Sequence, residues 1–455
     1  MSAEEKARVR PWIRCGGDGT RRRTRLAALA SLVATAAVAQ PFPNGGELQV
    51  NTLTSQQQIN PAVAADGAGR FVVVWQSAVS GGDDTSSYSI QLQRYSATGA
   101  PVGAQVQVNS YTSGAQSHPG VAARAGGEFV VVWESYGSGY DPYGLSVRAR
   151  RFDATGTPVG AEFQVNTFTS GDQRNAAVAV DSLGRTVVVW ESEGSSAGDT
   201  SFTSVHAQRY AADGAPAGAP MQVNSYTTDY QGSPAVAIDP QGNFVVAWQS
   251  DASSYDADDY SIQASIFNAA GAALTGQFQV SSSTTGPQVD AAVAANGLGQ
   301  FLVVWNSASS AGTDTSAGSI QAQFLDAQGG LGDEFQVNSF TPGSQFRPAV
   351  AGGASNGFVV VWDSDGSAGS DGDASSIQVQ YLGGTDFQVN TYTTGSQSNA
   401  AVAADAAGNF VVTWKGNGSA GTDTSLSSIH AQRYDALFRD GFESGGSGRW
   451  SSSLP

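Results

Sequence analysis

The sequence predicts an all-β fold, a seven-bladed β-propeller of four-stranded blades in which the N-terminal strand completes the last blade. Three observations predict it. An apolar run ending in tryptophan recurs at a nearly constant interval, four strand-like segments recur within each interval, and the chain ends carry complementary fragments of one repeat. An interval of this size is typical of repeat architectures.

The apolar run Phe-Val-Val-Val-Trp at residues 71–75 is the most regular part of the repeat. Its consecutive apolar, mostly β-branched residues indicate a strand that is covered on both faces, as the neighbouring blades of a propeller would cover it. The tryptophans are separated by 58, 57, 58, 57, 57 and 52 residues and are Trp75, Trp133, Trp190, Trp248, Trp305, Trp362 and Trp414.

Each repeat begins with a short strand of small residues (61–65 in the first repeat) and a tight Asp-x-x-Gly turn (66–69), in which Asp closes the turn and Gly accepts a positive φ. The tryptophan-ended strand follows. A long Ser/Gly/Asp loop then leads to a third strand (90–95), and a Gly/Pro turn leads to a fourth (106–109) with alternating polar residues. This gradient from small to polar matches the order from the inner to the outer strand of a blade.

The chain ends predict how the ring closes. The Gln-Val-Asn segment at 49–51 has no strands one to three before it, and the last repeat (400–434) has no fourth strand after it. If the first segment completes the last repeat, no sheet edge stays open between the chain ends. A linear solenoid would instead need polar caps at both ends, and the sequence shows none. We therefore assign residues 48–434 to the propeller, 40–47 to a lead-in and 435–455 to a flexible Gly/Ser-rich tail.

The N-terminal residues 1–39 read as a secretory signal peptide, with an arginine-rich segment, an apolar run and a final Ala-Val-Ala. We expect a secreted protein, extracellular or periplasmic, that does not insert into a membrane. Residues 40–455 contain 14 basic and 36 acidic residues, which disfavours nucleic acid as a partner. The single cysteine, Cys15, lies in the leader. We expect a monomer whose partner is an extracellular glycan or protein.

The repeat, as in Ala-Gln-Arg-Tyr at 207–210, Gln-Val-Asn-Ser-Tyr-Thr at 222–227 and Gly-Asn-Phe-Val-Val-Ala-Trp at 242–248, resembles repeats in secreted and surface proteins of bacteria. Those proteins are similar in architecture to WD40- and TolB-like propellers. The resemblance covers about residues 48–434 and implies fold and export, but no catalytic residues. The tail motif Asp-Gly-Phe-Glu-Ser-Gly at 440–445 looks like a C-terminal tail of exported proteins of some Gram-negative bacteria.

One polar residue precedes each small-residue strand, and its type varies while the strand hardly changes. In a closed ring these seven residues would surround the mouth of the channel on the face with the long loops, where function is usually found. They either bind a ligand, with His118, Asp290 and Arg347 as the distinctive groups, or simply cap the strand starts. The seven are Asn60, His118, Asn175, Ser233, Asp290, Arg347 and Asn399.

An aspartate recurs in the long loops, nine residues after the tryptophan in five repeats. Loops rich in carboxylates suit weak calcium sites, although an Asp followed by Thr-Ser is also a frequent turn former. No other cofactor is expected. The candidate calcium ligands are Asp84, Asp199, Asp314, Asp371, Asp373 and Asp423, with 371–373 as the best single site.

The histidines predict no catalytic cluster. His206 and His430 occupy the same third-strand position, where other repeats carry glutamine, and are expected to be interchangeable surface residues. A sialidase-type aspartate box is absent, because six residues rather than three separate Gly69 from Trp75. No pair of carboxylates for a glycosidase can be nominated.

These observations favour a secreted, non-catalytic scaffold, not an enzyme, which binds a glycan or a surface protein through its long-loop face. The alternatives are a hydrolase or lyase acting on polysaccharide, and a purely structural or adhesive module stabilised by calcium.

Overall fold

The structure is a computed structural model that describes residues 41–435, apart from 79–81, 85–86, 139–140, 195–201, 252–258, 310, 315–317, 354–356, 373, 419–420, 422 and 424–425. All its elements are β-strands. The leader (1–39) and the tail (436–455) lie outside the described residues. Within the described residues, no helix is long and apolar enough to cross a membrane.

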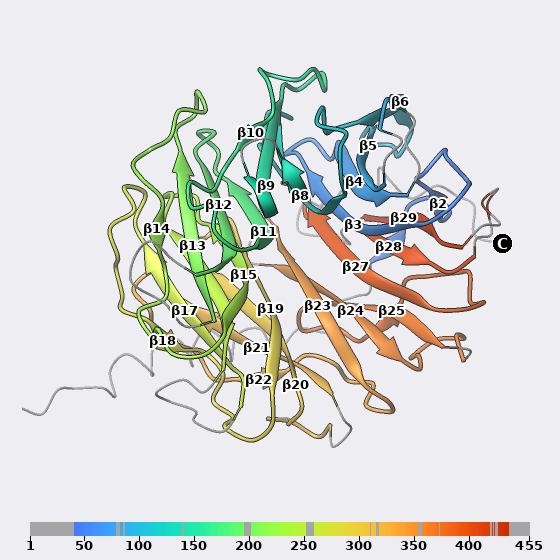
Figure 1. Ribbon diagram of the computed structural model, residues 1–455. Coiled ribbons are helices and arrows are strands. Elements are labelled where there is room, and N and C mark those ends of the chain that lie inside the picture. Colours follow the sequence, from blue (N-terminus) through green and yellow to red (C-terminus); the bar gives the residue numbers. More distant parts are fainter. Residues whose placement is uncertain are drawn as a thin grey trace, which may run out of the picture.

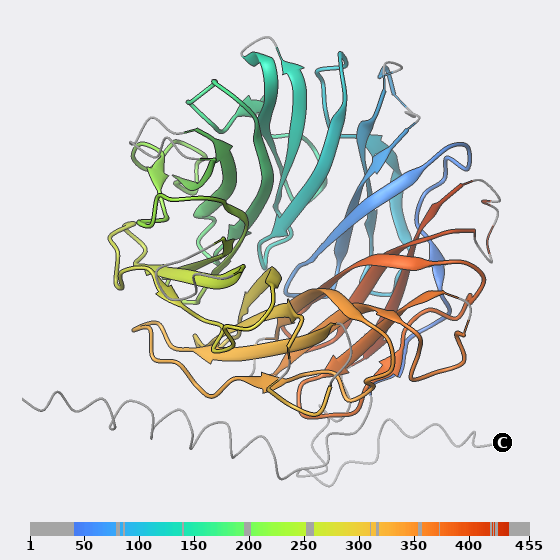
Figure 2. The same cartoon turned by 60° about the horizontal axis from the view of Figure 1, so that its bottom comes forward.

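The strands form seven antiparallel sheets arranged around a central axis, which confirms the predicted propeller (Figures 1 and 2). Blade 1 contains β3 (Gln58–Ala65), β4 (Phe71–Ser77), β5 (Ser89–Tyr95) and β6 (Pro101–Gln107). Blade 2 contains β7 (Gln116–Ala123), β8 (Phe129–Ser138), β9 (Asp141–Phe152) and β10 (Phe163–Gln164). Blade 3 contains β11 (Gln173–Val180), β12 (Thr186–Glu193), β13 (Thr203–Tyr210) and β14 (Met221–Gln222).

The other blades repeat this pattern. Blade 4 contains β15 (Gln231–Ile238), β16 (Phe244–Ser250), β17 (Ser261–Phe267) and β18 (Phe278–Gln279). Blade 5 contains β19 (Gln288–Ala295), β20 (Phe301–Ser307), β21 (Ser319–Leu325) and β22 (Phe335–Gln336). Blade 6 contains β23 (Gln345–Gly352), β24 (Phe358–Asp365), β25 (Ser375–Tyr381) and β26 (Phe387–Gln388). Blade 7 contains β27 (Gln397–Ala404), β28 (Phe410–Gly416) and β29 (Ser428–Asp435), and it is completed by β1 (Phe42–Pro43) and β2 (Leu48–Gln49).

The N-terminal segment closes the ring. In β2, Gln49 pairs with His430 of β29, in the register by which Gln222 of β14 pairs with His206 in blade 3. Asn51 then accepts the N–H of Ile429 at 2.8 Å, as Asn109 does from Ile90 in blade 1. The first strands of all blades contact one another in an unbroken cycle that returns from β27 to β3. The chain start therefore acts as an ordinary fourth strand of blade 7.

The core lies between the blades, as the apolar second strands predict. Every residue of β4 is buried, and each apolar cluster combines neighbouring sheets, such as Val245 and Ala247 of blade 4 with Trp305 of blade 5. Each of the seven tryptophans donates its indole N–H to the glutamine that opens the first strand of its own blade, at 2.8–3.2 Å. This bond satisfies the one polar atom of a buried ring.

Arginines connect blades on the face of the short Asp-x-x-Gly turns. Arg94 at the end of β5 donates to the carbonyls of Ala154 (3.2 Å) and Thr155 in the next blade. The same third-strand position holds Arg151, Arg209 and Arg433, which donate to Ala212 (2.8 Å), Ala269 (3.2 Å) and Ala97 of the next blades. In blades 4, 5 and 6 this position holds Ile266, Phe324 and Tyr381. Four of the seven junctions thus carry an arginine clasp.

Candidate functional site at the channel mouth

A bulge in every first strand forms the channel mouth. The register of β3 against β4 shifts between Ile59 and Ala62, and all the other first strands shift at the equivalent place. One residue in each bulge has a left-handed backbone, which is uncommon for a residue other than glycine. We call these seven the mouth ring: Asn60, His118, Asn175, Ser233, Asp290, Arg347 and Asn399, with φ from 47 to 58°.

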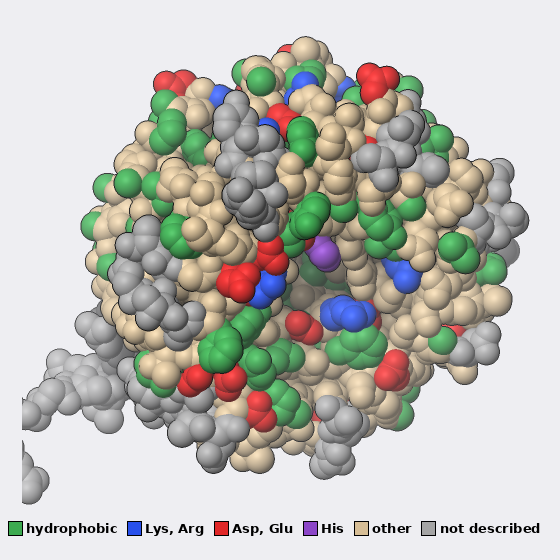
Figure 3. Space-filling model, in the orientation of Figure 1, with side chains coloured by type: hydrophobic (Ala, Val, Ile, Leu, Met, Phe, Trp, Pro, Cys, Tyr) green, Lys and Arg blue, Asp and Glu red, His purple; other side chains and the backbone are tan. Residues whose placement is uncertain are grey.

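The predicted mouth residues therefore come together in one ring, where the structure is hollowed. Figure 3 shows acidic, basic and histidine side chains around this central hollow. The four neutral members are half-buried, whereas His118, Asp290 and Arg347 are exposed. His118 belongs to blade 2 and the other two to blades 5 and 6, so they lie on opposite sides of the channel.

A second ring, which the sequence reasoning missed, lies directly beneath the first. It consists of the residue that follows each core tryptophan, and we call it the acceptor ring. In five blades its side chain accepts the backbone N–H of the mouth residue in the next blade, as Gln76 does from His118 (3.3 Å) and Gln249 from Asp290 (3.2 Å), whereas Lys415 carries only donors. The seven are Gln76, Glu134, Glu191, Gln249, Asn306, Asp363 and Lys415.

Three members of the acceptor ring are buried carboxylates. Glu134 is 3% exposed, and Glu191 and Asp363 are fully buried. A neutral amide satisfies the same N–H in blades 1 and 4, so the ring geometry does not require a charge at this position. Burying a carboxylate is costly unless partners compensate it. These three therefore break the repeat in a way that the fold alone does not explain.

His118 and Glu134 form a dyad at the mouth. Nδ1 of His118 lies 2.8 Å from Oε2 of Glu134, and the imidazole is 56% exposed while the carboxylate is 4% exposed. The hydrogen bond to Glu134 raises the pKa of His118 against the opposing effect of burial. In the neutral imidazole, Nδ1–H donates to Glu134, and Nε2 carries the basic lone pair.

Glu191 anchors a second cluster in blades 3 and 4. Arg174 Nε lies 2.8 Å from Glu191 Oε1. The hydroxyl of Tyr230 donates to Oε2 at 2.7 Å, and the side-chain amide of Asn175 donates to the same oxygen at 3.0 Å. Burial, reinforced by the adjacent carboxylate, raises the pKa of Tyr230. Tyr230 therefore donates a hydrogen bond here and is a poor base.

Asp363, Arg347 and Asp290 form the third cluster. Asp363 accepts the backbone N–H groups of Asn399 (2.9 Å) and Ala400 (3.3 Å), and Arg347 Nη1 lies 3.5 Å from its Oδ2. Burial raises the pKa of Asp363 to about 6, although these partners oppose the shift. Partial desolvation by the surrounding mouth also raises the pKa of Asp290, although its side chain reaches solvent, and Arg347 counteracts part of that rise. Acids in this state hold a proton to a higher pH than usual.

The candidate calcium ligands that the structure describes are buried and bound to the fourth strand. The side chain of Asn109 donates to Asp84 Oδ2 at 2.9 Å, and Asn390 does the same to Asp371 at 2.8 Å. Asp314 and Asp423 receive the same bond from Asn338 and Asn51, at 2.7 and 2.8 Å. Asp199 and Asp373 lie outside the described residues. In the described part of the chain, no three His, Cys, Asp or Glu side chains are grouped to hold a metal.

His206 and His430 are not surface residues, which corrects the expectation from the sequence. They are 6% and 2% exposed and stack on Trp190 and Trp414 at 5.8 Å between ring centroids. His430 Nδ1 also lies 2.8 Å from Oε1 of Glu47 in the N-terminal segment. The glutamines at this position in other repeats were misleading, because they too are buried where the fourth strand covers the third.

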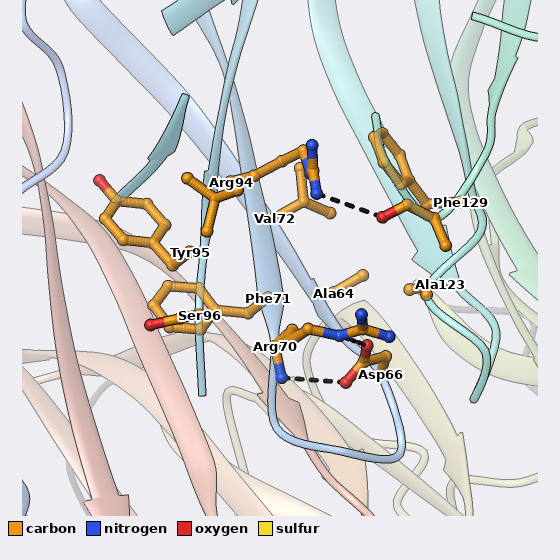
Figure 4. A pocket seen from close by; sticks show the side chains of 13 residues that line it. Ala64, Asp66, Arg70, Phe71, Val72, Arg94, Tyr95, Ser96, Ala123 and Phe129 are labelled. Atoms are coloured by element: carbon orange, nitrogen blue, oxygen red, sulfur yellow. Dashed lines mark hydrogen bonds and ion pairs between the residues drawn. The ribbon is translucent and has the colours of Figure 1, made fainter. Parts of the chain in front are cut away.

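A crevice of about 180 Å³ lies between blades 1 and 2, at the short-turn end of the sheets (Figure 4). Its walls include Phe71, Phe129 and Val72, and its charged groups are engaged within the protein. Arg70 pairs with Asp66 at 2.5 Å, and Arg94 donates to the neighbouring blade. This crevice marks a blade junction, whereas the exposed histidine, aspartate and arginine of the mouth ring face solvent.

The acceptor ring could have been found from the sequence. Once the tryptophans are aligned, the next residue changes from Gln or Asn to an acid in blades 2, 3 and 6. The mouth ring was noticed because its residues vary beside a strand that hardly changes. The acceptor ring was overlooked because it directly follows the apolar run, which is the most regular part of the repeat. The buried carboxylates that support the mouth residues lie there.

The fold and the mouth define a seven-bladed propeller with titratable groups at its channel entrance. A protein of unknown function from Dyadobacter fermentans has a similar structure, with 12% identity over 87% of this chain and 99% of its own, at a TM-score of 0.50. This likeness shows the fold. No protein-family model and no curated protein matches the sequence.

Two structures of stated activity are also similar. An α-L-arabinofuranosidase from Fusarium graminearum is 10% identical over 87% of this chain and 98% of its own, at a TM-score of 0.46. A polysaccharide lyase is 12% identical over 89% of this chain and 95% of its own, at a TM-score of 0.47. The expectation of a non-catalytic scaffold that is not an enzyme is corrected, because the similar structures with a stated activity include glycoside hydrolases and this lyase.

Proposed function

We propose that this chain is an exported enzyme that cleaves polysaccharide at the channel mouth. One observation carries the proposal: the exposed imidazole of His118 is oriented by the buried carboxylate of Glu134 at 2.8 Å. A titratable group held by a second group is the arrangement of a general acid or base. The repeat does not require it, because Asn or Ser fills this mouth position in four other blades.

Hydrolysis of a glycosidic bond needs an acid for the leaving oxygen and a base for the attacking water. Asp290 is an exposed carboxyl group with a raised pKa on the opposite side of the mouth, which suits the acid. His118 Nε2 suits the base. Water gives its proton to His118 as its oxygen bonds to the anomeric carbon, and Asp290 protonates the leaving oxygen as the old bond breaks.

A lyase is the second candidate, and Arg347 favours it. The side chain of Arg347 is 55% exposed at the mouth. In β-elimination, the C–O bond to the leaving sugar breaks as a C=C bond forms, and the leaving oxygen takes a proton from an acid such as Asp290. The base removes the proton next to a uronate carboxylate, and a cation stabilises the charge that develops there. His118 and Arg347 together offer these two functions.

Export and a bacterial surface context support an extracellular polymer as the substrate. The leader at 1–39 and the resemblance of the repeat to those of secreted bacterial propellers point in this direction. The mouth lies on the face that carries the long loops, where an extended polymer has access. We further propose that the protein is a monomer and that the aspartate loops bind calcium weakly.

The test is an assay of the exported chain on neutral and acidic polysaccharides. New reducing ends report any cleavage, and ultraviolet absorbance of an unsaturated uronate reports elimination only. In His118→Asn, which copies Asn60 and Asn399 of the same ring, the rate should fall about 10²–10⁴-fold. The buried His206→Gln copies Gln91 and serves as the control. A full rate in His118→Asn, or no cleavage of any polymer by the native chain, would overturn the proposal.

A further inference from the structure

Arginine is scarce in this protein, and nearly every arginine in the described part of the chain is engaged by a neighbouring group. The chain has a formal net charge of −17, and eleven arginines lie in its described part. Ten of them have a carboxylate or a backbone carbonyl within 3.4 Å. They are Arg70, Arg94, Arg124, Arg148, Arg150, Arg151, Arg174, Arg185, Arg209 and Arg433.

Arg347 differs from these ten. Its only ion pair among the described residues is the 3.5 Å contact of Nη1 with Asp363. Its guanidinium carbon lies 5.5 Å from the ring centroid of Phe346, which supports the group without using its N–H donors. A guanidinium offers five donors in a planar fork that matches a carboxylate or a sulfate. Most of that capacity is directed to the mouth.

The backbone at Arg347 shows that the side chain is tolerated there rather than needed by the fold. Its φ is 50°, a conformation that asparagine adopts more easily than arginine. Asn60, Asn175 and Asn399 occupy the same position in other blades. An arginine at such a place points to an interaction outside the ring.

The overall negative charge opposes an anionic ligand, but it does not decide the outcome. Exposed charges more than about 8 Å apart are largely screened at physiological ionic strength. A bidentate contact with a guanidinium acts at hydrogen-bond distance and is about twice as strong as a neutral hydrogen bond. Once the anionic ligand is in the mouth, its contact with Arg347 therefore outweighs repulsion by the distant acidic residues. The net negative charge mainly lowers the rate at which the ligand associates.

We propose that the channel mouth recognises an anionic polysaccharide, with Arg347 binding the carboxylate or sulfate oxygens of a sugar unit beside Asp290. This inference rests on the proposed function, since it names the substrate class of the same site. Neutral polymers should bind weakly by comparison.

The experiment measures binding and cleavage of three probes: polygalacturonate as a carboxylated polymer, a carrageenan as a sulfated polymer, and arabinan as a neutral one. The variants are Arg347→Asn, which copies the neighbouring blades, and Arg347→Lys, which keeps the charge but loses the fork. Arg124→Asn, on the opposite face, is the control. We expect at least one acidic probe to bind, about tenfold weaker binding of it by Arg347→Asn, partial recovery by Arg347→Lys, and no change in the control.

The outcomes separate the two proposals. If the protein cleaves arabinan and Arg347→Asn cleaves it at the same rate, the proposal of an anionic substrate is wrong and the proposal of an enzyme stands. Arg347-dependent binding of an acidic probe without cleavage of any polymer would overturn the enzyme and keep the anionic ligand. Preference for one acidic probe identifies carboxylate or sulfate as the recognised group. Equal binding of all three probes would overturn the substrate class.

Discussion

Glu47 Oε2 accepts the backbone N–H of Thr391 at 2.8 Å and its hydroxyl at 2.6 Å, across 344 residues of sequence. The same bond joins other neighbouring blades, as between Gln105 and Thr52 or Glu162 and Ser110. Glu47 also lies 2.8 Å from His430, and both side chains are buried. The N-terminal segment thereby joins the last two blades.

Replacing Glu47 should weaken this closure. Glu47→Ala leaves His430 buried without its carboxylate, which should cost about 3 kcal/mol of unfolding free energy. Glu47→Gln should cost less, because Gln105 and Gln277 accept the equivalent bonds elsewhere. Urea denaturation measures both. Glu128→Ala removes a partly exposed pair with Arg124 on the turn face and should cost under about 1 kcal/mol. Equal losses in Glu47→Ala and Glu128→Ala would contradict this role.

Deleting residues 48–54 should unfold blade 7. The deletion removes β2 together with Asn51, which donates to Asp423 at 2.8 Å and accepts from Ile429. It also exposes the edge of β29, which favours aggregation. Differential scanning calorimetry should show a lower melting temperature than that of the full chain. Unchanged melting would mean that the ring is held without this strand.

Asp363 should make stability fall as the pH rises. Its pKa is about 6 in the folded chain and 3.8 ordinarily, so the folded state holds the proton longer. The unfolding free energy should decrease between about pH 4 and pH 6, by at most about 3 kcal/mol. Asp363→Asn, which resembles Asn306 of blade 5, should remove this slope. Denaturation at several pH values tests it, and an unaltered slope in the variant would assign the effect to other groups.

The pH dependence of cleavage should be bell-shaped. The active form needs protonated Asp290 and neutral His118, and both pKa values are raised. An aspartate that must be protonated and a histidine that must be neutral have the reverse of their usual protonation states. The alkaline limb of the profile therefore reports the pKa of His118, and the acidic limb reports that of Asp290. Glu134→Gln weakens the hydrogen bond and removes the charge that together raise the pKa of His118, so the alkaline limb should move down toward pH 6.5. A limb that stays in place would exclude His118 as the titrating group.

The fold was predictable because its cause repeats. A tryptophan at a constant interval, with a turn and four strand-like runs around it, leaves few architectures open, and the orphan segment at 49–51 indicated the closure. The mouth ring was predictable for the same reason. The left-handed bulge at these positions could not be predicted, because residues as different as Asn60 and Arg347 occupy it.

The chemistry of the site was less predictable because it depends on which side chains meet across neighbouring strands and loops. Glu134 and His118 are 16 residues apart, and nothing in that separation indicates that one buried carboxylate orients one exposed imidazole. Likewise, Asp84 looks like a calcium ligand until Asn109 is seen to bind its carboxylate. Periodicity identifies equivalent positions, but it does not show which side chains meet.

The arginine clasps divide the ring into two arcs, one with clasps at its blade junctions and one without. Arg433, Arg94, Arg151 and Arg209 fasten the arc from blade 7 through blades 1, 2 and 3 to blade 4. The arc from blade 4 through 5 and 6 to 7 has Ile266, Phe324 and Tyr381 in their place. Asp290 and Arg347 lie in the arc without clasps, whereas His118 lies in blade 2, which is clasped on both sides. We therefore expect the junctions between blades 4 and 7 to separate first when the ring is destabilised, which hydrogen exchange along the second strands would measure.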